Sequence, residues 1–586
     1  MCGIVGFYWE DNNDRLEGVV EKCLDTIAHR GPDHSAYWKD QSVYFGHTRL
    51  KIVDLSARAD QPYVFEHLVL SFNGEIYNFL DLRIELKKQG YRFDTESDTE
   101  VVIKAYHCWG NRCFEKLDGM FAIALYDRNQ RQIILARDIF GKKPLYFSAA
   151  GGFTFCSELN AFKILIRDLT LNSVALNHIL GIGYVLEPLT IYEQVEALLP
   201  SSFLEYSMDT GAIRIQKYYH YADAFRHKNR LSKADIISHT RELLLAAVAR
   251  RLMGDVPMGV FLSGGVDSGG IVSVIHWFHK KDFPCFTVGF SDSVYDELYH
   301  AANLADALGL EHHALNLSEI DRVDFDQYMN RADYVTFDNS AYPIFKMAQM
   351  ASHQVKFVLT GDGSDEVFGG YPTYIADELN RKLKWVIPFI RSSDMISGLN
   401  KKLKQKNDKV GLRTKISRFI SGADPDPRVA HYRWREIYNE EERIALLGEE
   451  HREMVYDTSP LKGFVKLYDI VSDLDVIDQH LYVDTFTWLS CNNLVKIDRN
   501  TMRAGIEARS PYLDKALTAF VASCPVHYKQ QKLILKEVLR SFLPEEVLRR
   551  RKTGFNAPVS KWFGIDGNEF EFYTRMVFEH IRSAND

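Results

Sequence analysis

The fold of this protein is most constrained by one short stretch near the middle of the chain, Ser263–Ser268, which reads Ser-Gly-Gly-Val-Asp-Ser. The apolar run Met258–Leu262 precedes it and is typical of a buried parallel strand. Gly269–Ile275 follows and can begin a helix. Glycines let backbone N–H groups approach an oxyanion closely, and a helix N-terminus adds unpaired donors and partial positive charge. The stretch therefore predicts a phosphate-binding turn between a strand and a helix.

An ordinary tight turn would show a similar pattern, because glycine-rich turns between strands and helices are common. The stretch lacks the lysine of the Walker loop, and it does not fit the Gly-x-Gly-x-x-Gly pattern of dinucleotide-binding proteins. Other parts of the chain must therefore indicate which phosphate chemistry takes place here.

Length and composition narrow the class of protein. A chain of 586 residues is too long for one hydrophobic core, so we expect two or more domains. The net charge of −8 argues against a nucleic-acid partner, and no apolar run approaches the roughly 18 residues that a membrane span needs. The first residues show no signal pattern, and eight scattered cysteines do not resemble a disulfide framework. We expect a cytoplasmic protein with reduced thiols and no membrane partner.

The second residue, Cys2, is a candidate nucleophile. If the initiator methionine is removed, a free α-amine stands beside the thiol, so that base and nucleophile arrive on one residue. A cysteine at this position is weak evidence by itself. The run Ile4–Phe7 predicts a strand, which would hold the terminus rigidly.

Polar clusters between strand-like runs strengthen this interpretation. His47–Asp54 alternates polar and apolar residues, and Ser71–Asn78 places an Asn-Gly pair between an apolar run and a helix. Ser97–Glu100 has the pattern of a helix N-cap, which is also its simplest interpretation. Met120–Asp127 and Gln132–Arg137 predict the two strands of a hairpin.

Taken in order, this array resembles the glutaminase domain of the class II, N-terminal-nucleophile amidotransferases, from about Cys2 to Tyr206. The resemblance implies an αββα sandwich in which Cys2 attacks the side-chain amide of glutamine, forms a thioester and releases ammonia. Asn73 and the Gly74 N–H would form the oxyanion hole, where donors stabilise charge that appears only in the tetrahedral state.

The resemblance also implies a glutamine site. Arg49 would hold the α-carboxylate of glutamine through its guanidinium, and Glu75 and Asp98 would bind its α-amino group. The implied glutamine-binding residues are Arg49, Leu50, Ile52, Val53, Asn73, Gly74, Glu75 and Asp98.

The second half of the chain alternates strands and helices. After Met258–Ile275 come the strand-like run Cys285–Phe290, a predicted helix over Asp296–Leu308 and a third strand over Lys356–Leu359. Such alternation predicts an open, doubly wound parallel sheet whose ligands bind at the carboxyl ends of the strands. The loop Thr360–Tyr371 follows the third strand, so it should meet the Ser263–Ser268 turn in space.

That second loop carries three acidic residues, Asp362, Asp365 and Glu366. A solvated turn is the plain interpretation. Acidic side chains that face a phosphate need cations between them, and Mg²⁺ bound through one or two carboxylates plus phosphate oxygens is the usual solution. We therefore expect Asp267 and Asp365 to share Mg²⁺ with a pyrophosphate group.

Ser-Gly-Gly-x-Asp-Ser resembles the pyrophosphatase loop of ATP-dependent adenylating enzymes. Combined with the glutaminase pattern, it makes the chain similar to the glutamine-hydrolysing asparagine synthetases and their relatives. The same family is matched by Gly361–Tyr371, by Gly505–Asp514, and by Lys552–Phe555 with Pro558 and Trp562. The resemblance therefore covers most of the chain.

The implied reaction activates a carboxylate at the α-phosphate of ATP. Pyrophosphate leaves, and ammonia from the other domain displaces AMP to form an amide. Asp362 lies where the family forms the acyl-adenylate; the classical asparagine synthetases carry Glu there, and Asp also occurs among their relatives. Lys496 and Arg499 are candidates for a cation that contacts the phosphates, and a solvated helix face is the alternative interpretation.

The resemblance also implies an ATP site. Its residues are Phe261, Leu262, Ser263, Gly264, Gly265, Asp267, Ser268, Val288, Thr360 and Gly361.

The organisation that follows is a two-domain α/β protein. We expect a glutaminase domain over residues 1–206, a linker over 207–230 and a synthetase domain over 231–586, whose parallel sheet carries extra helices. Residues 377–470 are rich in Lys, Arg and Glu with periodic Leu and Ile, which indicates helices packed on the sheet. The basic run Lys401–Lys406 within them predicts an exposed helix end, a mobile loop or a partner site. A homodimer would be in keeping with the family.

The leading hypothesis is an ammonia-channelling enzyme that makes asparagine from aspartate, glutamine and ATP. The nearest alternative has the same chemistry on another acceptor, such as a uronic-acid sugar or a natural-product carboxylate. A non-catalytic relative is disfavoured because Cys2, Arg49, Asn73 and Asp98 are all present. An enzyme that modifies a nucleic acid is disfavoured by the acidic net charge.

Overall fold

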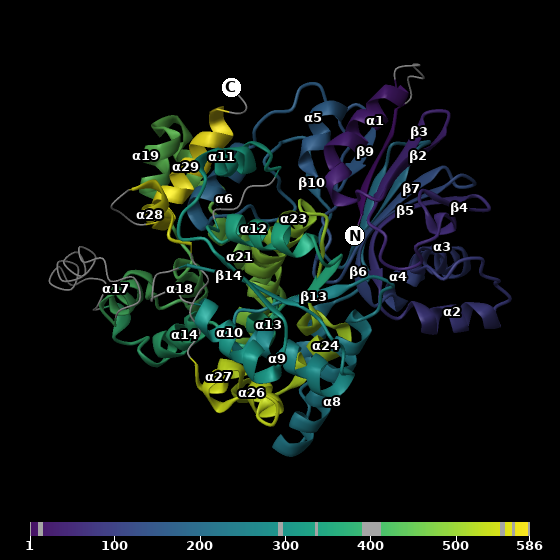
Figure 1. Ribbon diagram of the computed structural model, residues 1–586. Helices are drawn as coiled ribbons and strands as arrows, with labels where there is room; N and C mark the ends of the chain where they lie inside the picture. Colours follow the sequence, from purple (N-terminus) through teal and green to yellow (C-terminus); the bar gives the residue numbers. More distant parts are fainter. Residues whose placement is uncertain are drawn as a thin grey trace.

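The computed structural model describes residues 2–9, 16–290, 297–333, 338–388, 412–550, 557–564 and 569–583 (Figure 1). Met1, Asp296, the basic run Lys401–Lys406 and the motif Lys552–Phe555 lie outside the described residues. No described helix is long and apolar enough to cross a membrane.

The N-terminal half is built on two six-stranded antiparallel sheets. The first has the order β10-β8-β9-β1-β3-β2, and its strands are β1 (Gly3–Tyr8), β2 (His34–Asp40), β3 (Val43–Arg49), β8 (Tyr146–Ser148), β9 (Phe153–Cys156) and β10 (Glu196–Ala197). The second has the order β12-β11-β7-β6-β5-β4, and its strands are β4 (Tyr63–Phe65), β5 (Leu68–Ile76), β6 (Gly119–Asp127), β7 (Gln132–Arg137), β11 (Ser202–Ser207) and β12 (Ile213–Lys217). β12 and α7 (Tyr221–Arg226) fall within residues 207–230, the expected linker.

Alternation along the strands stacks the two sheets face to face. In β1, Ile4 and Tyr8 belong to the core between the sheets, whereas Val5 and Phe7 belong to the larger core that includes residues of α1 (Leu16–Ile27). This is the two-residue period of a strand that is buried on both faces. Helix α1 contacts β1 and β3, while α3 (Asp98–Trp109) contacts β5, so a helical layer covers each outer face. The predicted αββα sandwich is confirmed.

The C-terminal half contains a five-stranded parallel sheet in the order β15-β14-β13-β16-β17. Its strands are β13 (Met258–Phe261), β14 (Cys285–Gly289), β15 (His312–Asn316), β16 (Phe357–Leu359) and β17 (Glu507–Arg509). The strand order reverses between β13 and β16, which are neighbours in space but not in sequence, and this arrangement confirms the predicted doubly wound sheet. Ligands bind at such a switch point, outside the carboxyl ends of the strands.

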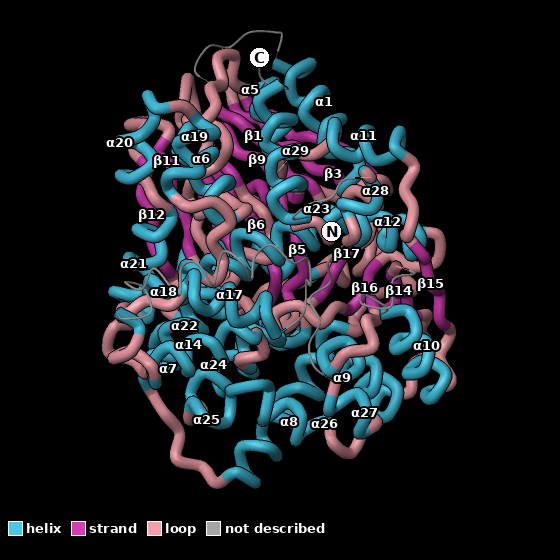
Figure 2. The backbone as a smooth tube through the Cα atoms, turned by 90° about the vertical axis from the view of Figure 1, so that its left-hand side faces the viewer, coloured by secondary structure: helices cyan, strands magenta, loops and turns pink. Residues whose placement is uncertain are grey.

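Helices cover the parallel sheet and connect it to the sandwich. β13 runs into α9 (Val266–Val274), while α10 (Glu297–Leu308) and α12 (Ala341–Ser352) contact β14. Figure 2 shows β17, at one edge of the sheet, next to the N-terminus and β5 of the sandwich. The described part of residues 377–470 is largely helical, as predicted, and its elements include α17 (Leu412–Gly422), α18 (Pro427–Arg433), α19 (Glu440–Leu447), α20 (Arg452–Asp457) and α21 (Pro460–Ile470).

An ion triad with a buried carboxylate ties the long helix α8 (Lys233–Arg251) to the segment after β17. Asp514 Oδ2 lies 2.7 Å from Arg250 Nη2 and 2.7 Å from Arg251 Nη1. Burial pushes the pKa of Asp514 upward, but the two guanidinium groups outweigh it and hold the pKa at about 2. Asp514 also caps α24 (Lys515–Ser523) by accepting from the Ala516 and Leu517 N–H groups.

We predict that Asp514→Ala destabilises this half of the protein. The substitution leaves two guanidinium groups without their shared carboxylate, and breaking a buried ion pair costs about 3–5 kcal/mol. Urea denaturation should show the loss. The control is Asp209→Ala, which removes an exposed pair with Arg131 and should change the free energy of unfolding by at most about 1 kcal/mol. Equal losses in the two variants would contradict the prediction.

Candidate functional site

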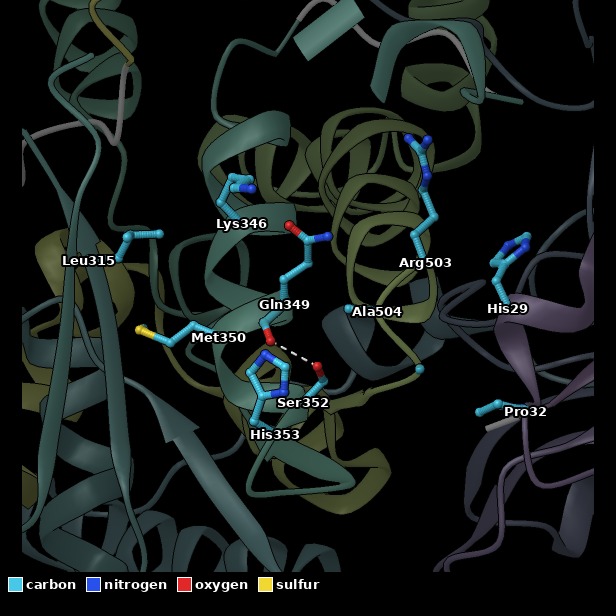
Figure 3. A pocket seen from close by; sticks show the side chains of 11 residues that line it. His29, Pro32, Leu315, Lys346, Gln349, Met350, Ser352, His353, Arg503 and Ala504 are labelled. Atoms are coloured by element: carbon cyan, nitrogen blue, oxygen red, sulfur yellow. Dashed lines mark hydrogen bonds between the residues drawn. The ribbon is translucent and has the colours of Figure 1, made fainter. Parts of the chain in front are cut away.

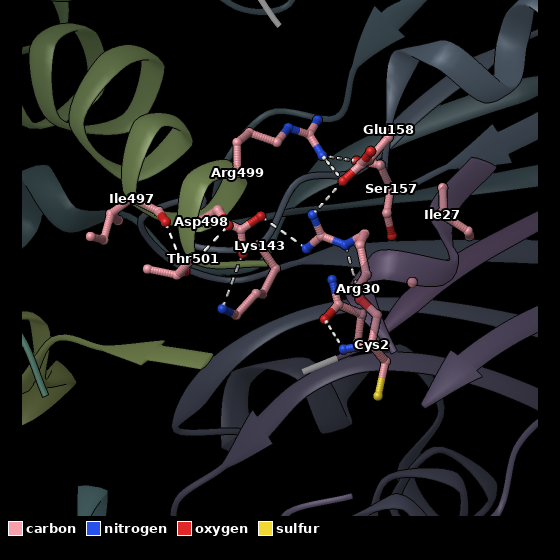
Figure 4. A network of polar contacts seen from close by, with 12 residues as sticks. Cys2, Ile27, Arg30, Lys143, Ser157, Glu158, Ile497, Asp498, Arg499 and Thr501 are labelled. Carbon is pink, nitrogen blue, oxygen red and sulfur yellow. Dashed lines mark hydrogen bonds and ion pairs between the residues drawn. The ribbon is translucent and has the colours of Figure 1, made fainter. Parts of the chain in front are cut away.

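Cys2 is buried at the start of β1 and is held by residues on either side of it. Its backbone N–H donates to Asn73 Oδ1 of β5 over 3.1 Å, and Arg30 Nε donates to its carbonyl over 3.1 Å (Figure 4). Asn73 Nδ2 is buried and has no hydrogen-bond partner in the described part of the structure. A hydrogen-bond donor of β5 thus lies close to the predicted nucleophile.

Groups around the Cys2 thiol oppose the effect of its burial. Burial raises the pKa of the Cys2 thiol, while a backbone N–H of Leu50 and the charge of Arg49 lower it. In Cys23 and Cys285, by contrast, burial alone raises the pKa to about 12. Leu50 and Arg49 therefore offset part of the effect of burial, and the pKa of the Cys2 thiol remains raised.

Gly74 lies where β5 and β6 approach each other closely. Its register partner in β6 is Phe121, and a Cβ on Gly74 would lie 2.1 Å from the Met120 carbonyl oxygen. A side chain at this position would push β5 away from β6 and shift the neighbouring Asn73. The oxyanion-hole geometry expected from the sequence therefore depends on a glycine here.

Two predicted carboxylates lie near this site. Burial raises the pKa of Asp98 to about 6, against the opposing effect of the Ile76 N–H, which donates to Asp98 Oδ2 over 2.9 Å. Burial and the charge of Glu507 raise the pKa of Glu75 well above its usual range, and Arg509 opposes them. Glu75 Oε1 lies 3.3 Å from Arg509 Nη2, so a residue of the C-terminal half reaches this site.

Arg49 is held by the loop that follows it. Its guanidinium lies 2.5 Å from Asp60 Oδ1, and it donates to the carbonyls of Asp54, at 2.5 Å, and Val53, at 3.3 Å. Ile52 is buried, and its carbonyl accepts from the N–H of Asp255 in the C-terminal half over 2.8 Å. Of these predicted residues, Val53 contacts Arg49 directly and Ile52 lies at the boundary between the halves.

The turn in the C-terminal half has the strand–turn–helix form that the sequence predicts. Ser268 Oγ accepts from the Ser263 N–H over 3.0 Å and lies 3.0 Å from Ser263 Oγ, which closes the turn. Gly264 has a φ of +68°, and a Cβ there would lie 2.6 Å from the Ala301 nitrogen, so the position requires glycine. Phe261 and Leu262 lead into the turn and are buried.

The structure brings the two predicted loops together. Ser364 Oγ donates to Asp267 Oδ1 over 2.8 Å. Lys532 Nζ lies 2.5 Å from Asp267 Oδ1 and 2.7 Å from Asp365 Oδ1, so one ammonium group bridges the two carboxylates. These are the two residues that the sequence predicts as Mg²⁺ ligands. Sequence reasoning missed Lys532, because it lies 265 residues from Asp267 and no local pattern marks it.

The two candidate phosphate cations, Lys496 and Arg499, form ion pairs in the structure. Lys496 Nζ lies 2.5 Å from Asp338 Oδ2. Arg499 is fully buried at the boundary between the halves, 3.3 Å from Glu158 and 3.3 Å from Asp333. The cation that joins the two loops is therefore Lys532.

The remaining predicted residues surround the switch point. Thr360 follows β16, and its N–H donates to the Arg509 carbonyl over 2.9 Å; Val288 is buried in β14. Asp362 lies close enough to Glu366 to raise its pKa, which burial already lifts, to about 7.

A cavity of about 630 Å³ opens elsewhere between the two halves (Figure 3). Its walls come from the N-terminal half, from α12 and from the segment after α23 (Leu494–Met502). The lining residues are His29, Pro32, Leu315, Lys346, Gln349, Met350, Ser352, His353, Arg503, Ala504 and Gly505. None of the residues predicted for glutamine or ATP lines it, so it is separate from both sites.

Comparison with known proteins gives matches over nearly the whole chain. The family model described as asparagine synthase matches residues 239–580, and the one described as glutamine amidotransferase domain matches residues 1–219. The chain is 32% identical over 594 residues to asparagine synthetase [glutamine-hydrolyzing] 1 of Bacillus subtilis, which covers 97% of this chain and 89% of that protein. It is 28% identical over 636 residues to amidase chry2 of Gibberella zeae, which covers 96% of this chain and 90% of that protein.

Among solved structures, the glutamine phosphoribosylpyrophosphate amidotransferase of B. subtilis complexed with ADP and GMP aligns with 62% of this chain and 82% of its own. Its sequence identity is 14% and its TM-score is 0.29.

We predict that Gly74→Ala destabilises the sandwich and displaces Asn73. The added methyl group meets backbone atoms of β6 that cannot move freely, and overpacking of this kind costs about 1–3 kcal/mol. Gly18→Ala in α1 is the matched control, because a Cβ there meets nothing within 4 Å and alanine favours a helix. A thermal unfolding midpoint of Gly74→Ala equal to that of Gly18→Ala would contradict the prediction.

Proposed function

The chain belongs to the asparagine synthase family, and from that premise we propose that it converts a carboxylate into an amide with ammonia from glutamine and energy from ATP. The acceptor we propose is L-aspartate. L-aspartate, L-glutamine, ATP and water would then give L-asparagine, L-glutamate, AMP and diphosphate. The observation that carries the proposal is the presence, in one chain, of Cys2 held between Asn73 and Arg30 and of Asp267 and Asp365 joined by Lys532.

In the proposed glutaminase reaction, removal of Met1 leaves an α-amine on Cys2. Its nitrogen is the atom that donates to Asn73 Oδ1 in the structure. The amine accepts the thiol proton, and the sulfur attacks the amide carbon of glutamine. Asn73 Nδ2 and the Gly74 N–H would stabilise the oxyanion. Ammonia leaves with the transferred proton, and water then hydrolyses the thioester to glutamate.

Charged side chains of the same half would hold the two ends of glutamine. Arg49 is proposed for the α-carboxylate, because a guanidinium binds carboxylates in a bidentate manner. Glu75 and Asp98 are proposed for the α-ammonium group. Burial raises the pKa of each carboxyl group, and a bound ammonium group would favour their charged forms.

In the proposed synthetase reaction, the Ser263–Ser268 turn holds the pyrophosphate part of ATP. The turn offers hydroxyl groups and the N-terminus of α9, which suit a phosphate group. Asp267 and Asp365 suit Mg²⁺, because an oxygen of each converges on the Lys532 ammonium. When bound, Mg²⁺ would neutralise the charge that develops on the leaving pyrophosphate. Lys532 would supply further positive charge there.

Side chains beside Asp362 support a charged acceptor. Glu366 Oε1 accepts from Tyr371, at 2.7 Å, and from Asn493 Nδ2, at 3.2 Å. Lys496 Nζ donates to Asn493 Oδ1 over 3.4 Å. The Glu366 carboxyl group and the Lys496 ammonium, which also pairs with Asp338, thus flank the Asn493 amide. Such neighbouring charges of both signs suit an acceptor with both an amino and a carboxyl group.

A second candidate is the same chemistry on a different carboxylate, such as a uronic-acid sugar or a natural product. Two observations favour it. Asp362 is one methylene shorter than the glutamate expected for classical asparagine synthetases, and a relative of comparable coverage is named an amidase. We also propose small-molecule substrates without nucleic acid or membrane partners, a cytoplasmic location and a homodimeric state.

We predict that Cys2→Ala abolishes amide formation from glutamine but leaves amide formation from added ammonia intact. The nucleophile is lost, whereas the ATP site lies in the other half. Product formation with each nitrogen source measures the effect, and Cys23→Ala, a substitution at another buried cysteine of the same half, is the control. Loss of both activities in Cys2→Ala would contradict the proposed division of labour.

The acceptor can be identified by pyrophosphate release across a panel of carboxylates. We expect aspartate to give the fastest release from the purified full chain with ATP and Mg²⁺. Uronic acids and larger carboxylic acids form the rest of the panel. Faster release with any of these than with aspartate would favour the second candidate.

A further inference from the structure

Three contacts hold the buried side chain of Arg30, and one of them comes from the other half of the protein. Arg30, in the short helical turn Ala28–Arg30, donates through Nε to the Cys2 carbonyl over 3.1 Å. Its Nη1 lies 2.8 Å from Glu158 of the N-terminal half, and its Nη2 lies 2.9 Å from Asp498 of α23 (Figure 4). The Arg30 side chain thus links the main chain of Cys2, the predicted nucleophile, to Asp498 of the C-terminal half.

Because Arg30 is buried, its charge must be neutralised by carboxylates such as Asp498. Arg30 is fully buried, and a buried guanidinium without enough carboxylate partners is costly. Asp498 is also buried; despite this, Arg30 and Lys143 hold the pKa of its carboxyl group below its usual value. Asp498 is therefore charged and, together with Glu158, fixes the Arg30 guanidinium in place.

A second contact crosses the same boundary at Glu75. Arg509 lies in β17, and its carbonyl accepts from the N–H of Thr360, the first residue of the loop after β16. Its Nη2 lies 3.3 Å from Glu75 Oε1, and its Nη1 is held by the Arg251 carbonyl at 3.0 Å. Arg509 thus contacts both proposed sites. Its backbone carbonyl contacts Thr360 of the proposed ATP site, and its side chain contacts Glu75 of the proposed glutamine site.

We propose that the C-terminal half completes the glutaminase site, with Asp498 positioning Cys2 through Arg30 and Arg509 orienting Glu75. Asp498 and Arg509 are positioning residues, because each acts on the reacting groups through another side chain. The inference rests on the glutaminase activity proposed above for Cys2.

The two contacts should have different kinetic effects. Loss of the Asp498 charge frees Arg30 to turn toward Glu158, and the Cys2 carbonyl then loses its donor. A misplaced nucleophile slows the chemical step more than it weakens substrate binding. Loss of Arg509 removes the positive charge that opposes protonation of Glu75, so that Glu75 attracts the α-ammonium group of glutamine less strongly. That change weakens binding.

The first test is Asp498→Asn, which keeps the shape of the side chain and removes its charge. In the full chain, we expect kcat for glutamine hydrolysis to fall on the order of 10²-fold while KM for glutamine stays nearly constant. Amide formation from added ammonia should stay at the wild-type rate, which also shows that the C-terminal half is folded. The double variant Arg30→Gln, Asp498→Asn should have nearly the same kcat for glutamine hydrolysis as Arg30→Gln alone. Both changes break the same chain of contacts, which runs from Asp498 through Arg30 to Cys2.

The second test is Arg509→Gln. We expect KM for glutamine to rise about tenfold or more, with a smaller change in kcat, as for the loss of a binding interaction. Arg509→Lys, which retains the charge, should restore part of the affinity.

The matched control is Lys356→Met. It removes another ion pair between the halves, with Lys356 Nζ 2.9 Å from Asp33 Oδ1, that contacts neither Cys2 nor Glu75. We expect its kinetics with glutamine to equal those of the wild type.

The outcomes separate this inference from the proposed function. A wild-type chain that does not hydrolyse glutamine would overturn both. A wild-type chain that does, together with an unchanged kcat in Asp498→Asn and an unchanged KM in Arg509→Gln, would overturn only the inference. Parallel loss of the ammonia-dependent reaction in Asp498→Asn would also overturn it, because the role of Asp498 would then be structural.

Discussion

The structure depends on the pairing of buried charges at the boundary between its two halves. Arg30 and Arg499 are withdrawn from water there, and Glu158, Asp333 and Asp498 neutralise them. Because an unpaired buried charge is far more costly than an exposed one, such pairs disfavour any other docking of the two halves. The relative position of the two predicted active sites follows from this docking.

Topology determines which residues reach that boundary. The parallel sheet reverses its strand order between β13 and β16, and this brings the Ser263–Ser268 turn beside the loop with Asp365. β17 extends the same sheet toward the sandwich, where Arg509 meets Glu75. The sheet that carries the proposed ATP site therefore also contacts the proposed glutamine site, as an enzyme that transfers ammonia between two sites would require.

Some features were predictable because their signals are local. The strand–turn–helix around Gly264 follows from consecutive residues, and the N-cap at Ser97 follows from four. The sandwich and the parallel sheet were predictable from strand alternation, helix alternation and the family resemblance. Lys532 was not predictable, because its two carboxylate partners lie 265 and 167 positions earlier in the chain and packing alone brings them together. The partners of Lys496 and Arg499, the two candidates for a phosphate contact, were not predictable either: Asp338 pairs with Lys496, and Glu158 and Asp333 pair with Arg499.

The sequence by itself determined the local units of the proposed chemistry: a thiol at the second residue, an Asn-Gly pair on a strand and a glycine turn before a helix. These units need only neighbouring residues, since backbone conformation and hydrogen-bond donors are set over a few positions. Only the tertiary structure decided which charges meet, namely Lys532 with Asp267 and Asp365, and Asp498 with Arg30. The reason is physical: the strength of an ion pair depends on the distance between its charges and on their burial, and neither quantity is encoded by order along the chain.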